Sequence, residues 1–214
     1  MSLPDPNAIY PNPNIPEMVF VKNVVTRPNI TVGEYTYYDD KNNPEKFEDH
    51  VTHHYEFLND KLIIGKFCSI ASGIEFVMNG ANHVMEGITT YPFNILGGEW
   101  ADHIPTLADL PLKGDTVVGN DVWFGQNVTV MPGVKIHDGA IVAANTTVVK
   151  DVEPYLIVGG NPSRLLKYRF SAEEIQLLEK LAWWNKDINW ISEHIEELTI
   201  DKVDVSKLHQ WIDS

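Results

Sequence analysis

The chain has 214 residues, of which 43% are hydrophobic and 21% charged, a composition typical of one soluble globular domain with appendages. Its formal net charge is -14 with only 16 lysine and arginine residues, which argues against nucleic acid as a partner. A single cysteine excludes an intramolecular disulfide, no apolar run is long enough for a membrane helix, and no signal-peptide pattern opens the chain, so we expect a cytoplasmic protein.

Residues 1–61 are predicted to form an N-terminal arm and loop segment. Five prolines within residues 1–16 remove backbone donors and fix φ, which predicts an extended arm. His50, His53 and His54 lie close together further along. Their spacing matches no standard zinc pattern and no cysteine joins them, so we expect solvated or interface histidines and no bound metal.

A spacing of six residues between apolar positions begins near Leu62. Ile64, Ile70 and Phe76 follow this period, and Cys68 and Ile74 each lie four residues after a member of the series. Cys68 is therefore predicted to point into a core as a buried, inert thiol. An acyl-enzyme nucleophile would need to be accessible.

Residues 77–117 interrupt the period. They contain turn signals such as Asn79-Gly80 and no six-residue repeat, which predicts a long excursion that leaves the regular structure and returns to it. Segments of this kind in compact domains are usually functional or disordered. The aromatic residues Tyr91, Phe93 and Trp100 favour an ordered excursion.

The period of six resumes at Val118 and continues to Val152. An α-helix needs apolar residues about 3.6 apart and a two-faced strand needs alternation, so neither explains the spacing. A solenoid does, because each repeat buries its apolar residues only against its neighbours. We therefore predict a β-helix over residues 62–163. Its inward positions are Val118, Phe124, Val130, Ile136, Val142 and Val148, and, four residues after each, Val122, Val128, Val134, Ala140, Thr146 and Val152.

Residues 164–214 are predicted to form a C-terminal helical segment. Ser171 and Glu174 have the spacing of a capping box, which marks a helix start. Asp187 precedes a second helical pattern, and residues 203–212 are expected to add a short third helix. The apolar stripes of the first two helices are Ile175, Leu178 and Leu181, and Ile188, Ile191, Ile195 and Leu198.

Six short motifs stand out along the chain. They are Ile64-Gly-Lys-Phe-Cys-Ser-Ile70, Met78-Asn-Gly-Ala-Asn-His83, Gly119-Asn-Asp-Val-Trp-Phe-Gly125, Val130-Met-Pro-Gly-Val-Lys-Ile136, Val158-Gly-Gly-Asn-Pro162 and Trp183-Trp-Asn185. In combination they resemble the xenobiotic acetyltransferase family, hexapeptide-repeat enzymes that act on streptogramin A antibiotics and on chloramphenicol. The segments 33–38, 79–83 and 91–93 look more like the streptogramin branch.

This resemblance implies a left-handed parallel β-helix and a homotrimer with active sites between subunits. It also implies direct transfer of an acetyl group from acetyl-CoA to a hydroxyl of a small-molecule acceptor, with streptogramin A as the expected acceptor. Chloramphenicol or a sugar is the alternative acceptor. A non-catalytic hexapeptide scaffold is the alternative of another class, and a metal-dependent β-helix is disfavoured because only His137 lies in register.

His83 is the expected general base. Attack of a hydroxyl on a thioester needs a group that takes the hydroxyl proton, and imidazole suits this because it titrates near neutral pH. The motif match selects His83, which can afterwards return the proton to the departing thiolate. Asn82 and Glu86 lie near it, but the sequence does not show which group orients the ring.

Two groups of residues are expected to bind the substrates. By resemblance Trp123 borders the active site, and we expect apolar walls for the acceptor, although packing between subunits would explain them equally well. The small residues near the end of the coil leave backbone amides accessible to pantetheine, and nearby basic residues suit its phosphates. The acceptor residues are Tyr37, Tyr55, Met78, Pro105, Leu110 and Trp123. The acetyl-CoA residues are Trp123, Ala143, Ala144, Lys150, Gly159, Gly160, Pro162 and Lys167, with Arg169 as a further cation.

The sequence departs from the family pattern in the coil and in the excursion. Met131 and His137 stand where the repeat usually has a small residue, and Val149 is a third departure, which should alter the surface of the coil and not its core. Ile88-Thr89-Thr90 carries an added residue before Tyr91. We therefore expect an acceptor pocket of altered shape.

Overall fold

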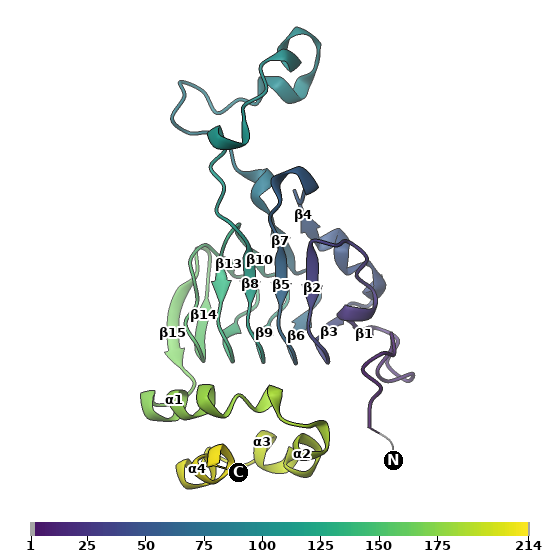
Figure 1. The fold of residues 1–214 in the computed structure, drawn as a ribbon, viewed down its shortest axis with the longest axis vertical. Helices are drawn as coiled ribbons and strands as arrows, with labels where there is room; N and C mark the ends of the chain where they lie inside the picture. Colours follow the sequence, from purple (N-terminus) through teal and green to yellow (C-terminus); the bar gives the residue numbers. More distant parts are fainter. Residues whose placement is uncertain (1–2, 214) are drawn as a thin grey trace.

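A computed structural model describes residues 3–213, and its centre is a parallel β-helix with three faces (Figure 1). Each coil gives one short strand to each of three sheets. Strands of successive coils pair in parallel and in register, for example Leu62 with Ile30 on one side and with Thr116 on the other. The predicted parallel β-helix is confirmed.

The coils pass through the sheets in the order B, A, C. Sheet B contains β2 (Ile30–Val32), β5 (Leu62–Ile64), β8 (Thr116–Val118) and β11 (Lys135–Ile136). Sheet A contains β1 (Met18–Phe20), β3 (Tyr37–Asp39), β6 (Ser69–Ala71), β9 (Trp123–Phe124), β12 (Ile141–Val142), β14 (Leu156–Gly159) and β15 (Arg164–Tyr168). Sheet C contains β4 (Val51–Thr52), β7 (Glu75–Val77), β10 (Thr129–Val130) and β13 (Thr147–Val148).

The core of the β-helix is built from the residues that the period of six marks as inward. All twelve predicted positions between Val118 and Val152 are at most 4% exposed. Ile64, Cys68, Ile70, Ile74 and Phe76 are at most 2% exposed and belong to the same core. Apolar side chains stacked from coil to coil therefore hold the molecule together.

The coil begins earlier than the predicted boundary at residue 62. Strands β2, β3 and β4 form a complete first coil, which pairs with the second in parallel. A helical stretch at Pro44–His50 separates β3 from β4, and a turn at Glu56–Leu58 separates this coil from the next one. Because these insertions break the spacing of six, the repeat could not be counted there.

The N-terminal arm differs from the extended segment that its prolines predict. Residues 3–16 form successive turns, with Ala8 N donating to Asp5 O and Ile15 N to Asn12 O. The side chain of Asn23 ties the arm down by donating to the carbonyls of Pro6 and Ala8. The arm thus forms folded turns, because backbone N–H groups and the side chain of Asn23 donate hydrogen bonds to its carbonyl groups.

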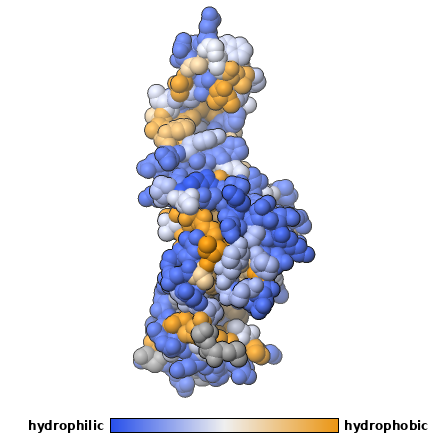
Figure 2. Space-filling view, turned by 90° about the vertical axis from the view of Figure 1, so that its right-hand side faces the viewer, coloured by the Kyte–Doolittle hydropathy of each residue, from blue (hydrophilic) through white to orange (hydrophobic). Residues whose placement is uncertain are grey.

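The excursion between β7 and β8 projects from one side of the stacked coils, opposite the C-terminal helices (Figure 1). It contains short 3₁₀ turns, at Asn79–Ala81, Phe93–Leu96, Gly98–Asp102 and Leu107–Asp109. Phe93 packs edge-on against Tyr91 and Trp100, with ring centroids 4.8 and 5.1 Å away. Figure 2 shows apolar side chains gathered on this projecting part.

The C-terminal segment starts with a strand and then becomes helical. Residues 164–168 form β15, which pairs with β14 in antiparallel orientation. The prediction that the segment is helical from residue 164 was therefore wrong for these five residues. The helices are α1 (Ala172–Leu181), α2 (Ile188–Glu193), α3 (Ile195–Thr199) and α4 (Val205–Asp213). The capping box of Ser171 and Glu174 is confirmed. The second predicted helix is divided at His194, whose φ and ψ are not helical.

Within residues 3–213, no helix combines the length and the apolar content that crossing a membrane requires.

Candidate functional site

His83 lies in the excursion, directly after the turn that begins at Asn79. Its Nδ1 donates to the backbone carbonyl of Thr90 at 2.8 Å. In neutral imidazole the lone pair then lies on Nε2, the nitrogen that a general base needs. The anchor of the ring is therefore Thr90. Two other residues lie near His83 in sequence, but Glu86 accepts from Met85 N and Asn82 donates to Pro111 O.

A cavity of about 420 Å³ adjoins His83. Its wall combines apolar groups with a cation and polar groups, which suits a largely apolar ligand with a few polar atoms. The sequence singles out His83 but not most of this wall, because residues from both ends of the excursion form it. The lining residues are Ala81, Asn82, His83, Met85, Thr90, Pro111 and Lys113.

The predicted acceptor residues divide between the excursion and the coils. Tyr55 lies at the root of the excursion, where its ring would clash with a Cβ atom on Gly80 at 2.5 Å. Pro105 and Leu110 are half-buried within the excursion. Met78 is 0% exposed in the core of the β-helix, so its prediction as a wall of an open pocket was wrong. It precedes the turn at Asn79 and still follows the inward direction of the coil.

Tyr37 and Trp123 lie on the outer face of sheet A. A cross-strand row runs over this face in the order Tyr37, Ser69, Trp123, Ile141, Ile157 and Lys167. Neighbouring strands are about 4.8 Å apart, so about 10 Å separate Tyr37 from Trp123 and about 14 Å separate Trp123 from Lys167. The indole of Trp123 is 54% exposed. None of these residues lines the cavity of His83.

The small residues expected at pantetheine stack at the corner between sheets A and C. A Cβ atom on Gly125 would lie 2.6 Å from Ala144 N, so the coils approach closely there. Ala144, Gly160 and Pro162 are exposed. Gly159 is buried, because Leu166 of β15 covers it, and its prediction as an open backbone surface was wrong.

The basic residues expected near phosphates have different surroundings. Lys150 and Lys167 are exposed. Arg169 instead donates to Gly139 O at 2.7 Å and lies 3.6 Å from Asp121, at the corner between sheets B and A. It is therefore engaged in an ion pair that ties β15 to the coil.

Asp121 belongs to a second cavity, of about 590 Å³, between the coils and the C-terminal helices. Burial raises the pKa of Asp121 to about 6, although the guanidinium of Arg169 opposes this shift. Burial also raises the pKa of the neighbouring Tyr155 hydroxyl. Folding thus removes water from around the carboxyl of Asp121, which disfavours its charged form.

Cys68 and the three histidines before the coil have no place in either cavity. The thiol of Cys68 is 0% exposed and burial raises its pKa to about 12, as predicted for an inert core cysteine. His50 contacts the hydroxyl of Tyr38 at 2.9 Å, whereas His54 is buried against Asp60. The part of the chain that the structure describes contains no cluster of three or more His, Cys, Asp or Glu residues that could hold a metal ion.

Residues 115–150 match the model of a protein family described as bacterial transferase hexapeptide (six repeats). The chain is 64% identical over 161 residues to a probable macrolide acetyltransferase of Lysinibacillus sphaericus, covering 75% of this chain and 89% of the relative. It is 50% identical over 192 residues to a virginiamycin A acetyltransferase of Staphylococcus aureus, covering 90% and 87%. It is 44% identical over 164 residues to a chloramphenicol acetyltransferase of Klebsiella aerogenes, covering 75% and 78%.

Proposed function

The chain belongs to the xenobiotic acetyltransferases, a family of hexapeptide-repeat acyltransferases, and from this we propose that it transfers an acetyl group from acetyl-CoA to a hydroxyl of streptogramin A. His83 is the general base. The observation that carries this role is the hydrogen bond from Nδ1 to Thr90, which leaves the basic lone pair on Nε2. The scaffold alternative fails because the chain is an acyltransferase.

The proposed reaction is a direct transfer in a ternary complex. Nε2 of His83 takes the proton as the acceptor oxygen attacks the thioester carbonyl carbon. The C–S bond then breaks and the imidazolium returns its proton to the departing thiolate, so the products are an acetyl ester and a free thiol. Burial of Cys68 supports direct transfer, because a covalent acyl-enzyme needs an accessible thiolate.

The active site is proposed to lie between subunits of a homotrimer of left-handed β-helices. His83 and its cavity belong to the projecting excursion, whereas Tyr37 and Trp123 lie on sheet A and do not line that cavity. Packing of the excursion against sheet A of a neighbour would unite them. The exposed apolar residues of the excursion support this packing, since large exposed apolar surfaces mark interaction sites. They include Met85, Ile88, Ile95, Leu96, Ile104 and Leu107.

The row on sheet A is proposed to carry both substrates. Tyr37 would face the acceptor, and Trp123 would separate it from the donor. The small residues Ala144 and Gly160 would admit pantetheine, with Lys150 and Lys167 available for its phosphates. Since acetyl-CoA is the donor, we place the protein in the cytoplasm.

A thiol-release assay tests this function. The protein is incubated with acetyl-CoA and, separately, streptogramin A, a macrolide, chloramphenicol and a simple sugar, and free thiol is followed. We expect the largest kcat/KM with streptogramin A, and His83→Ala should lower kcat by about 10² to 10⁴. His137→Ala is the matched control, because His137 is exposed on the coil and lines neither cavity.

The buried thiol of Cys68 should not contribute to this signal. Full activity of His83→Ala would reject the general base. Release with the macrolide or chloramphenicol but not with streptogramin A would replace the acceptor and keep the chemistry. Release with none of the four would reject the proposed reaction.

A further inference from the structure

Asn79 lies at the start of the excursion, and all the donor and acceptor positions of its side chain form hydrogen bonds. The residue is 2% exposed. Its Nδ2 donates to Asp60 Oδ2 at 2.7 Å and to Gly114 O at 2.8 Å. Its Oδ1 accepts from Lys113 N at 2.6 Å and from Asn82 Nδ2 at 3.3 Å. A primary amide offers two N–H groups and two lone pairs, so this side chain is saturated.

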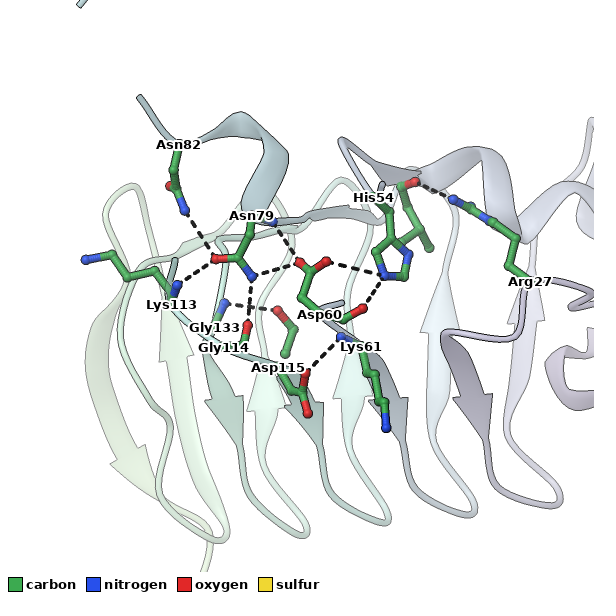
Figure 3. Close-up of polar contacts among 12 residues, drawn as sticks. Arg27, His54, Asp60, Lys61, Asn79, Asn82, Lys113, Gly114, Asp115 and Gly133 are labelled. Carbon is green, nitrogen blue, oxygen red and sulfur yellow. Dashed lines mark hydrogen bonds and ion pairs between the residues drawn. The ribbon is translucent and has the colours of Figure 1, made fainter. Parts of the chain in front are cut away.

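Asp60 fixes Asn79 from below (Figure 3). Its carboxylate is 4% exposed, and Oδ2 also accepts from the backbone N of Asn79 at 3.0 Å. The buried ring of His54 lies beside it, donating through Nε2 to Asp60 O at 2.9 Å, with Oδ1 3.9 Å away. The two hydrogen bonds from Asn79 to Oδ2 fix the direction of the carboxylate, whereas Oδ1 has no hydrogen-bond partner among the described residues.

These contacts join the two ends of the excursion. Asn79 and Asn82 precede the projecting part, whereas Pro111, Lys113 and Gly114 follow it. Asn82 Nδ2 adds a bond to Pro111 O at 3.2 Å. The chain therefore leaves and re-enters the coil at adjacent positions. The hydrogen bonds between these positions offset the entropy cost of closing the long loop.

The same pattern occurs at an ordinary corner of the coil, without an excursion. There Asp138 Oδ1 accepts from Asn120 N at 2.6 Å and from Asn120 Nδ2 at 2.9 Å. Asn120 Oδ1 in turn accepts from Lys66 N at 2.8 Å. Asp60, Asn79 and Lys113 repeat these three hydrogen bonds, with the difference that the bond to Lys113 N joins the two ends of the excursion.

The hydrogen bonds of Asp60 and Asn79 that join the two ends of the excursion, here called the clamp, extend to the cavity of the general base. Asn82 precedes His83 in the chain, and both Asn82 and Lys113 line the cavity with His83 and Thr90. Both are held by Asn79 Oδ1. Release of this oxygen would therefore free two walls of the cavity and the segment that aims the imidazole.

We propose that Asp60 and Asn79 are positioning residues for the acetyl transfer, which clamp the two ends of the excursion and thereby hold His83 where it acts as general base. This inference rests on the proposed function. Neither residue is required to touch a substrate. Errors of about 1 Å in the position of a catalytic group can cost on the order of 10² in rate, which sets the scale of the effect.

The test compares Asn79→Ala and Asp60→Ala with Asp138→Ala, the matched control that removes the same bonds at the ordinary corner. Acetyl-CoA binding by calorimetry counts the intact sites, and kcat is expressed per binding site. We expect the first two variants to lose about 10- to 100-fold in kcat, with the Kd of acetyl-CoA within about threefold of wild type. Asp138→Ala should keep kcat per site.

Asp60→Asn is the conservative variant, because its amide oxygen can still accept from Asn79. It should retain kcat within about threefold. Hydrogen exchange gives a readout that does not depend on activity. Residues 79–115 should exchange faster in Asn79→Ala than in wild type, and no faster in Asp138→Ala.

Unchanged kcat per site in Asn79→Ala, or an equal loss in Asp138→Ala, would overturn the inference. So would unchanged exchange in residues 79–115. Failure of the proposed function is a separate outcome, since it appears as an inactive wild type before any variant is compared. Exchange alone then decides whether the clamp holds the excursion.

Discussion

One hydrogen bond determines which nitrogen of His83 can act as a base. The sequence motif selects the residue, and Asn82 and Glu86 are its near neighbours, yet the ring is anchored by the carbonyl of Thr90. A backbone carbonyl leaves no mark in a sequence, and its position depends on how the intervening residues turn. The motif could therefore select His83 as a candidate base, whereas the orientation of its ring could not be predicted.

Asp121 is a second residue whose chemistry depends on the fold. Its pKa rises to about 6 from an ordinary value of 3.8, chiefly through burial. Between these two values the folded chain binds more protons than the unfolded chain. Its contribution to stability is thus complete below about pH 4 and is lost as the pH rises through about 6.

Asp121→Asn should remove this pH dependence. Compared with wild type, the variant should gain about 1 to 2 kcal/mol in unfolding free energy between pH 4.5 and pH 7.5, because asparagine cannot ionise. Asparagine also tolerates the positive φ of 54° at this position. Thermal unfolding of both proteins at the two pH values measures the difference. An identical pH dependence of Tm in the two proteins would contradict the assignment.

At the scale of elements, the regular coils could be predicted and the interrupted one could not. The strict period of six identifies the inward positions between Val118 and Val152, because a solenoid buries one set of side chains per face. The first coil obeys the same rule with Val32, Tyr38 and Val51, all buried, but the insertion at Pro44–His50 separates Tyr38 from Val51. Likewise, β15 was predicted as part of the helical segment, because its residues lie outside the repeat.

The cavity wall shows a further limit of the sequence. Pro111 and Lys113 lie far along the chain from His83 and carry no recognisable motif. Contacts of Asn79 with Lys113 and Gly114 bring them together. A pattern of local spacing contains no information about such long-range closure.

Close stacking of coils at the corner between sheets B and A depends on a column of glycines. A Cβ atom on Gly65 would lie 2.5 Å from Gly119 O, and one on Gly119 would lie 2.8 Å from Asp138 N. Gly119→Ala should therefore destabilise the fold by about 1 to 3 kcal/mol, as other overpacked sites do.

Gly87→Ala is the matched control for this substitution. Its added Cβ would meet only Thr89, with the nearest atom at 3.4 Å, so the unfolding free energy should change little. Thermal unfolding of both variants is the measurement. Equal Tm values for Gly119→Ala and Gly87→Ala would show that the corner can relax and that the column is not required.

The whole molecule separates the proposed general base from the face that is proposed to bind the substrates. The excursion with His83 projects beyond the coils (Figure 1), and exposed apolar side chains gather on part of its surface (Figure 2). The row from Tyr37 to Lys167 lies on sheet A, and the small residues proposed for the donor lie at its corner. One chain thus holds two halves of a site that we expect adjacent subunits to complete.

Subunit complementation tests this central claim most directly. His83→Ala removes the base, and Ala144→Trp blocks the exposed corner proposed for pantetheine. Each variant alone should be inactive. Hybrid trimers, purified through a different tag on each variant, should regain acetyl transfer at about one third of their sites, because one interface in three then joins an intact His83 to an intact corner. Hybrids that remain as inactive as either parent would contradict a site shared between subunits.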